Sequence, residues 1–180
     1  MVAALVLIGA PGSGKSSVLE ALMIRLEMDG HEYGAIESEQ LSLGSPLLSG
    51  SDWTQQLEAV LALQRESGRF RFLVSATVEN ADELRHVVQG TGADVPLVIC
   101  LNASADTVAA RIADREPDRW PGKPRLIAHA RELAQVIPTL AGNDVVIDTS
   151  ERLPEQVAAE VHTEMRSRGL IPARSDDRSA

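Results

Sequence analysis

Near its start the chain reads Gly9-Ala10-Pro11-Gly12-Ser13-Gly14-Lys15-Ser16, a full match to the pattern G-x-x-x-x-G-K-S/T. The residues before it, 3–8, form an uninterrupted apolar run, which is typical of a strand buried on both faces of a parallel sheet. Glycines in such a turn let backbone N–H groups point inward, and the N-terminal end of the next helix adds positive potential. This stretch therefore predicts a phosphate-binding loop between a buried strand and a helix.

Two side chains of this loop suit the phosphates of a nucleotide. Lys15 supplies a compact cation that stabilises the β- and γ-phosphates during transfer and is therefore also a catalytic candidate, and the Ser16 hydroxyl can ligate magnesium. We assign nucleotide binding to the whole loop and to the start of the helix that follows it: Gly9, Ala10, Pro11, Gly12, Ser13, Gly14, Lys15, Ser16 and Ser17.

Segments typical of strands and of helices alternate along the chain. Apolar runs predict strands at 3–8, 33–37, 70–76, 96–101 and 145–148, and helical spacing predicts helices at 16–28, 52–68, 81–89, 104–115, 125–136 and 154–168. Asp52 and Asn80 stand where helix N-caps are expected, and Ser104 starts a helix. The alternation predicts a three-layer α/β/α sandwich with a parallel sheet, in which ligands bind beyond the carboxyl ends of the strands.

Length and composition narrow the class of protein. The 180 residues suit a single domain, and 17 Lys and Arg against 26 Asp and Glu give a net charge of -9, which disfavours a nucleic-acid partner. The longest apolar run, 2–8, is far shorter than the roughly 20 residues of a membrane helix, so no membrane partner is expected. The single cysteine, Cys100, cannot form an internal disulfide. We predict a cytoplasmic protein.

The phosphate loop, the small size, the acidic residues after the second strand and an arginine-bearing interrupted helix pair resemble the P-loop small-molecule kinases. These include the adenylate, shikimate, gluconate and adenylylsulfate kinases, and the resemblance covers most of residues 1–168 as an order of elements. It implies the P-loop NTPase fold with a five-stranded parallel sheet in the order 2-3-1-4-5. The domain would span 1–170 with a lid at about 112–126, followed by a flexible tail at 171–180. ATP and Mg²⁺ would be the cofactors, and the γ-phosphoryl group would pass to a small-molecule acceptor.

Two carboxylates, Glu37 and Glu39, follow the second strand, where the γ-phosphate is expected. In shikimate-kinase-like enzymes an Asp-x-Asp pair at the corresponding place helps to hold magnesium and binds or deprotonates the acceptor hydroxyl. By this resemblance Glu37 and Glu39 are catalytic candidates, and Glu37 joins Ser16 as a metal candidate. Glu-x-Glu departs from that pattern, and solvated loop charges are the alternative interpretation.

Three arginines, Arg111, Arg115 and Arg119, lie on or after the helix that leads into the breaker-rich stretch 116–124. A guanidinium group matches phosphate geometry and neutralises charge that develops during phosphoryl transfer. In the resembling kinases, arginines at this place close over ATP. We therefore assign catalysis to Arg115 and Arg119 and nucleotide binding to Arg111. Salt bridges with Asp114 or Glu116 on the helix surface are the alternative.

Other polar residues are weaker candidates. Ser75 and Thr77 lie where the third strand ends and could bond a substrate, while Asp148 to Ser150 follow the last strand and are candidates on the nucleotide side. The histidines show no metal-ligand spacing, so we predict no zinc site: His31, His86, His129 and His162.

The leading hypothesis is a Mg²⁺-dependent kinase for a small metabolite, and two alternatives stay open. A nucleoside or nucleotide kinase would need a basic pocket for the acceptor phosphate, for which that half of the chain offers Arg65, Arg69, Arg71 and Arg85. An AAA-like ATPase or regulatory nucleotide-binding protein would hydrolyse or bind the nucleotide without an acceptor.

Overall fold

A computed structural model describes residues 1–46, 48 and 50–172 of the chain. Five parallel strands form one sheet in the order β2-β3-β1-β4-β5, as the resemblance to P-loop kinases implies. Their bounds are β1 Ala3–Ile8, β2 Gly34–Glu37, β3 Arg71–Ala76, β4 Val95–Asn102 and β5 Val145–Asp148. The strand before the phosphate loop, β1, is therefore the central strand, with β3 and β4 as its neighbours.

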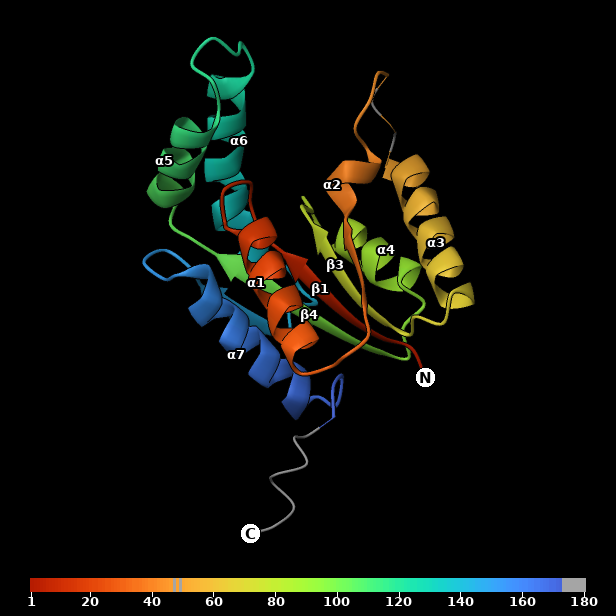
Figure 1. The fold of residues 1–180 in the computed structure, drawn as a ribbon. Helices are drawn as coiled ribbons and strands as arrows, with labels where there is room; N and C mark the ends of the chain where they lie inside the picture. The colour runs from red at the N-terminus through yellow and green to blue at the C-terminus, as the bar shows by residue number, and fades with distance from the viewer. Residues whose placement is uncertain (47, 49, 173–180) are drawn as a thin grey trace.

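Helices cover both faces of the sheet and make it a three-layer sandwich (Figure 1). Alternate residues of β1 explain this, because Leu5 and Leu7 point to one face while Val6 and Ile8 point to the other. Leu5 and Leu7 pack with α1 (Lys15–Met28) and α7 (Pro154–Ser167). The other face is covered by α3 (Gly50–Glu66), α4 (Ala81–Gly90), α5 (Ala105–Arg115), α6 (Lys123–Val136) and the 3-10 turn η1 (Ile137–Thr139). None of the described helices is long and apolar enough to cross a bilayer.

Of the two predicted helix caps, Asn80 is confirmed and Asp52 is wrong, while Ser104, predicted only to start a helix, is an N-cap. Asn80 accepts a hydrogen bond from the Glu83 amide at 2.9 Å, and Ser104 accepts one from the Thr107 amide at 3.0 Å. Helix α3 begins at Gly50, so Asp52 lies inside its first turn and is not its N-cap. The sequence also gave no sign of the short helix α2 (Ser38–Leu41), which directly follows β2.

The packed domain extends slightly further than the sequence predicted. Leu170 and Ile171 are each 2% exposed and pack among the side chains of α1 and α7. The carbonyl of Leu170 also accepts a hydrogen bond from Arg71 Nε at 2.7 Å. Ile171 is thus part of the core and not of a tail, and residues 173–180 lie outside the described part of the chain.

Candidate active site

The phosphate loop joins β1 to α1 at the centre of the edge where the strands end, between two projecting regions, α2 with α3 and α5 with α6 (Figure 1). Gly12 has a φ of +82°, and a Cβ atom there would lie 2.8 Å from the carbonyl oxygen of Val108. Only glycine meets both conditions, because other residues rarely adopt the left-handed region and the backbone of α5 fills the space. The loop is thus held closely against α5.

The ammonium group of Lys15 is buried inside the loop, with 6% of the residue exposed. It donates hydrogen bonds to the carbonyl oxygen of Gly9 at 3.0 Å and to Thr77 Oγ1 at 2.8 Å. Burial lowers the pKa of Lys15, an effect that the nearby charges of Glu39 and Glu37 oppose. The lysine is therefore an enclosed cation that faces the loop and its neighbours.

Glu39 is the carboxylate that contacts this lysine. Its Oε1 lies 3.4 Å from Lys15 Nζ and accepts a hydrogen bond from Thr77 Oγ1 at 2.6 Å. Burial alone would raise the pKa of Glu39, but the charge of Lys15 and the bonds from Thr77 and Lys15 outweigh it and hold this pKa below its ordinary value. Helix α2 places Glu39 here, so the element that sequence reasoning missed positions a predicted catalytic residue.

Glu37 occupies a different position from Glu39. It ends β2 opposite Ser75 of β3 and is half-buried, and its carboxylate makes no hydrogen bond with the described part of the chain. Its charge reaches Lys15 only at longer range. The structure therefore brings Glu39, and not Glu37, into contact with the phosphate loop.

Arg111 clamps the phosphate loop to the loop that follows β5. Its guanidinium donates to the carbonyl oxygens of Gly12 at 3.2 Å, Thr149 at 2.7 Å and Ser150 at 3.3 Å. Thr149, 3% exposed, completes the junction, because its hydroxyl donates to the Ser13 carbonyl at 2.8 Å. Thr149 was only a general candidate from the sequence, since hydropathy does not report a contact between residues so far apart in the chain.

The two lid arginines differ in their surroundings. Arg115 ends α5 and pairs with Glu116, with Nη2 2.8 Å from Oε1, as the salt-bridge alternative expected. It still lines a cavity at the phosphate loop. Arg119 is exposed and makes no hydrogen bond or ion pair with the residues that the structure describes.

The segment between α5 and α6 covers residues 116–122, and Lys123 fastens its base. The ammonium of Lys123 donates to the carbonyl of Ala113 in the last turn of α5 at 2.6 Å, to the carbonyl of the C-cap residue Glu116 at 2.8 Å, and to Asp118 at 2.7 Å. A cation at the end of a helix satisfies carbonyls that have no partner within the helix. Both helix ends are therefore tied together where the sequence predicted a lid.

Two adjoining cavities meet at the phosphate loop. One, of about 260 Å³, is lined by Pro11, Gly12, Gly14, Lys15, Ser16, Ser17, Glu39, Arg111 and Arg115. The second, of about 210 Å³, is lined by Ser13, Gly14, Ser17, Val18, Arg111, Thr149, Arg152, Pro154 and Val157. Most of the predicted site residues thus converge, whereas Gly9, Ala10, Glu37 and Arg119 line neither cavity.

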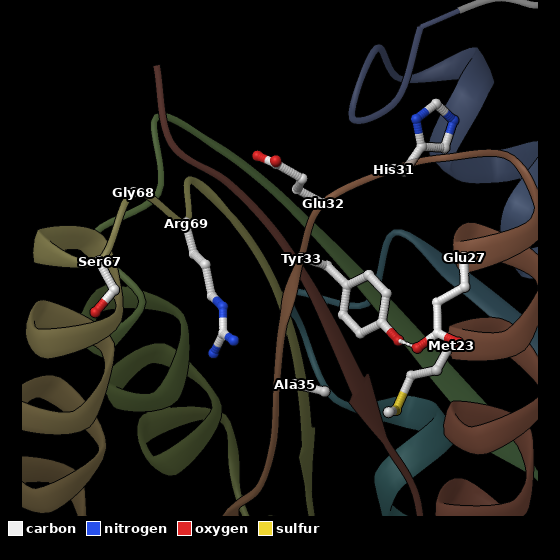
Figure 2. A pocket seen from close by; sticks show the side chains of 9 residues that line it. All are labelled: Met23, Glu27, His31, Glu32, Tyr33, Ala35, Ser67, Gly68 and Arg69. Carbon is white, nitrogen blue, oxygen red and sulfur yellow. Dashed lines mark hydrogen bonds between the residues drawn. The ribbon is translucent and has the colours of Figure 1, made fainter.

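A larger cavity, of about 580 Å³, lies at the opposite edge of the sheet, where the strands begin (Figure 2). Tyr33 and Arg69 line it, and Tyr33 Oη donates to Glu27 at 2.6 Å. Burial and that carboxylate raise the pKa of Tyr33 to about 12. None of its lining residues belongs to the phosphate loop, so we do not assign the reaction to it.

His31 and His162, which lie far apart in the sequence, come close together in the structure. Potential ligand atoms of Asp29, His31 and His162 all lie within 4.8 Å of one another, and Figure 2 shows His31 turned toward α7. However, Arg166 Nη2 lies 3.4 Å from the same Asp29 oxygen that His162 Nε2 approaches at 3.1 Å. A guanidinium group beside the carboxylate opposes a metal cation, so we interpret the group as a polar network, with an ion pair between Arg166 and Asp29, that joins the end of α1 to α7.

Asp148 ends the edge strand β5, and its carboxylate is hydrogen-bonded by Ser150. Oδ1 accepts hydrogen bonds from the Ser150 amide at 2.9 Å and hydroxyl at 2.7 Å, which lower the pKa of Asp148. The neighbours of β1 end in Ala76 and Asn102, neither of which is acidic. The strands beside the phosphate-loop strand therefore carry no terminal acid of the kind that ATPase machines use.

Comparison with known protein families gives a match over most of this chain. A profile described as AAA domain matches residues 5–139, most of the chain. A search of curated proteins finds no match.

Solved structures with the same fold include kinases of small molecules. A sugar kinase from Janibacter sp. HTCC2649 is 15% identical, with a TM-score of 0.65 over 96% of this chain and 100% of its own. The adenylylsulfate (APS) kinase of Mycobacterium tuberculosis, in complex with AMPPNP and APS, is 17% identical, with a TM-score of 0.64 over 90% and 96%. Shikimate kinase from Acinetobacter baumannii, in complex with shikimate, is 15% identical, with a TM-score of 0.59 over 95% and 97%. At these identities the likeness establishes a P-loop kinase-like fold.

Proposed function

This chain belongs to the AAA domain family, and within that family we propose that it is a kinase that transfers the γ-phosphoryl group of ATP to a hydroxyl of a small molecule. The observation that carries the proposal is the contact among Lys15, Thr77 and Glu39 at the phosphate loop, beside the two adjoining cavities. A cation and a carboxylate held by one hydroxyl supply a group for the phosphates and a group for the acceptor. A cytoplasmic location stays a prediction from the single cysteine.

The two cavities suit the two parts of ATP. The phosphates would lie in the cavity lined by Lys15 and Arg115, and the nucleoside in the cavity lined by Arg152 and Pro154. Arg111 borders both, so it would hold the junction between them by fixing the loops on either side.

The chain also offers a fitting place for Mg²⁺. The Ser16 side chain is exposed at the cavity wall and makes no hydrogen bond with other described residues, so its oxygen is available as a ligand. Glu37 would act only from further away, through water. When bound, the ion would neutralise charge on the phosphate oxygens during transfer.

Lys15 and Glu39 would change partners in the reaction. Lys15 bonds Glu39 and a backbone carbonyl in the nucleotide-free chain, and phosphate oxygens would compete for it. Glu39, ionised at neutral pH because its pKa is low, could then accept the proton of the acceptor hydroxyl. The acceptor oxygen forms the new bond to the γ-phosphorus, the bond from that phosphorus to the bridging oxygen breaks, and ADP leaves with the electron pair.

An acceptor-independent ATPase is the second candidate, because the AAA domain family leaves it open. The absence of an acidic residue at the ends of β3 and β4 counts against it. Stoichiometry separates the two functions, since a kinase makes one phosphorylated acceptor per ADP while an ATPase releases inorganic phosphate.

The test is to compare Lys15→Ala and Glu39→Gln with the unaltered chain. Lys15→Ala should abolish MgATP binding measured by calorimetry, because the loop loses its only cation. Glu39→Gln should bind MgATP but form ADP roughly 100-fold more slowly in the presence of acceptors, as expected for loss of a general base. Arg85→Ala, on the surface of α4, is the control and should match the unaltered chain. Normal MgATP binding by Lys15→Ala would contradict the proposal.

A further inference from the structure

We propose that the acceptor is a hydroxyl compound that carries no negative charge, either a neutral polyol or an amine-bearing one. This inference rests on the proposed kinase function and concerns the side of the site formed by α2, the start of α3 and residues 77–80 after β3. Figure 1 shows α2 and α3 on one side of the phosphate loop and α5 and α6 on the other. We call the first of these the acceptor side.

The acceptor side contains acidic residues and no basic ones. Between residues 34 and 64 the sequence has no lysine, arginine or histidine, and α2, the end of β2 and the start of α3 carry Glu37, Glu39 and Asp52. Residues 77–80, which follow β3, add Glu79 and again no cation. This part of the site is therefore formed entirely by neutral and negatively charged residues.

The arginines that could have served an anionic acceptor lie at the opposite edge of the sheet. Arg65 donates to the Thr91 carbonyl at 2.9 Å, beyond the end of α4, and its guanidinium lies 5.8 Å from the centre of the Phe72 ring. Arg71, at the start of β3, donates to the carbonyls of Leu170 at 2.7 Å and Glu32 at 2.8 Å. Arg69 lines the cavity at the beginning of the strands (Figure 2). None of the three faces the phosphate loop.

The remaining basic side chains near the site either pair with other residues or lie on the side of the phosphate loop formed by α5 and α6. Arg85 pairs with Asp82 at 2.6 Å on the surface of α4. His129 of α6 reaches across to Glu79, with Nε2 3.1 Å from Oε1. Lys15 and Arg115 line the phosphate cavity, and Arg119 and Arg125 lie on the side of α5 and α6. The only described cations that line the phosphate cavity are thus those that the nucleotide phosphates would bind.

The charge distribution decides which acceptors can approach. An acceptor hydroxyl must come next to a triphosphate, so a carboxylate or phosphate on the acceptor would be repelled by the nucleotide and by Glu37 and Glu39. Burial of such an anion needs a paired cation, and the acceptor side supplies none. An uncharged hydroxyl compound meets no such repulsion. An amine would find Glu37, a half-buried carboxylate that makes no hydrogen bond with the described residues.

The experiment measures transfer to matched triplets of acceptors with the full chain and MgATP. Each triplet contains a neutral sugar, its amino sugar and its uronate, such as glucose, glucosamine and glucuronate, and the readout is phosphorylated acceptor per ADP. In every triplet that is used, kcat/KM for the neutral or amino member should exceed that for the anionic member by roughly tenfold or more, the usual scale of like-charge discrimination. Preference for the anionic member would overturn the inference while the kinase function stands. If the chain phosphorylates no compound of any charge, the kinase function fails and the inference fails with it.

Variants of two carboxylates test the location of the acceptor. Glu37→Gln should lower kcat/KM for the amino member relative to the neutral member, whereas Glu58→Gln, on the exposed surface of α3, should leave this ratio unchanged. Equal ratios in the two variants would contradict the placement of the acceptor beside Glu37.

Discussion

Removal of the Thr149 hydroxyl should weaken both the fold and the nucleotide site. The side chain is 3% exposed, and its Oγ1 lies 2.8 Å from the Ser13 carbonyl, to which it donates, and 3.1 Å from the Asn102 carbonyl. Thr149→Val keeps the shape but leaves the buried Ser13 carbonyl without this donor, which should cost about 1–3 kcal/mol in the free energy of unfolding. Thr149→Ser keeps the donor and should lose only about 0.8 kcal/mol for the missing methyl group.

Urea unfolding provides the measurement, followed by both circular dichroism and tryptophan fluorescence so that two-state behaviour is checked. The melting temperature should fall by about 2–4 °C per kcal/mol for a chain of this size. Because Ser13 belongs to the phosphate loop, Thr149→Val should also weaken MgATP binding, while Thr149→Ser should retain it. If the valine variant is no less stable than the serine variant, the hydroxyl does not tie β5 to the phosphate loop and the reasoning is refuted.

Three further outcomes are expected. Gly12→Ala should lower the free energy of unfolding by about 1–2 kcal/mol because of its left-handed backbone, and by about 1–3 kcal/mol more because the new Cβ collides with α5. Gly30→Ala is the control, since Gly30 has a φ of +72° but open space around it, so only the backbone cost should appear in the same urea titration. Lys123→Met leaves the carbonyls of Ala113 in α5 and of its C-cap Glu116 without a charged donor, so it should cost about 1–3 kcal/mol in the free energy of unfolding and speed proteolysis within 116–122. Unchanged cleavage would show that Lys123 does not hold this segment. Burial and Arg166 lower the pKa of His162 from 6.5, so the unfolded chain takes up its proton first and the free energy of unfolding should fall as the pH drops below about 6.5. His162→Gln should flatten that part of the pH profile, and an unaltered slope would contradict the assignment.

The sequence by itself determined the elements and the phosphate loop, because these depend on neighbouring residues. A continuous apolar run can only be buried on both faces, the spacing of glycines sets which turn the backbone can make, and caps such as Asn80 and Ser104 bond amides three residues away. These local features resemble those of P-loop kinases, and that resemblance implied the strand order. The structure confirms this order. Local patterns failed at Asp52, which lies inside the first turn of α3, and at α2, whose Glu39 contacts Lys15 and Thr77 from distant parts of the chain.

Only the tertiary structure decided which side chains meet. Lys15, Glu39 and Thr77 come together because β3 lies beside β1 and α2 turns back over the end of β3, and no periodicity in the sequence reports that contact. In the same way the folded chain places Arg65 and Arg71 at the edge where strands begin, far from the phosphate loop. Hydrophobic patterns show which face of an element is buried, whereas the charge that surrounds a substrate depends on how the ends of separate elements are arranged.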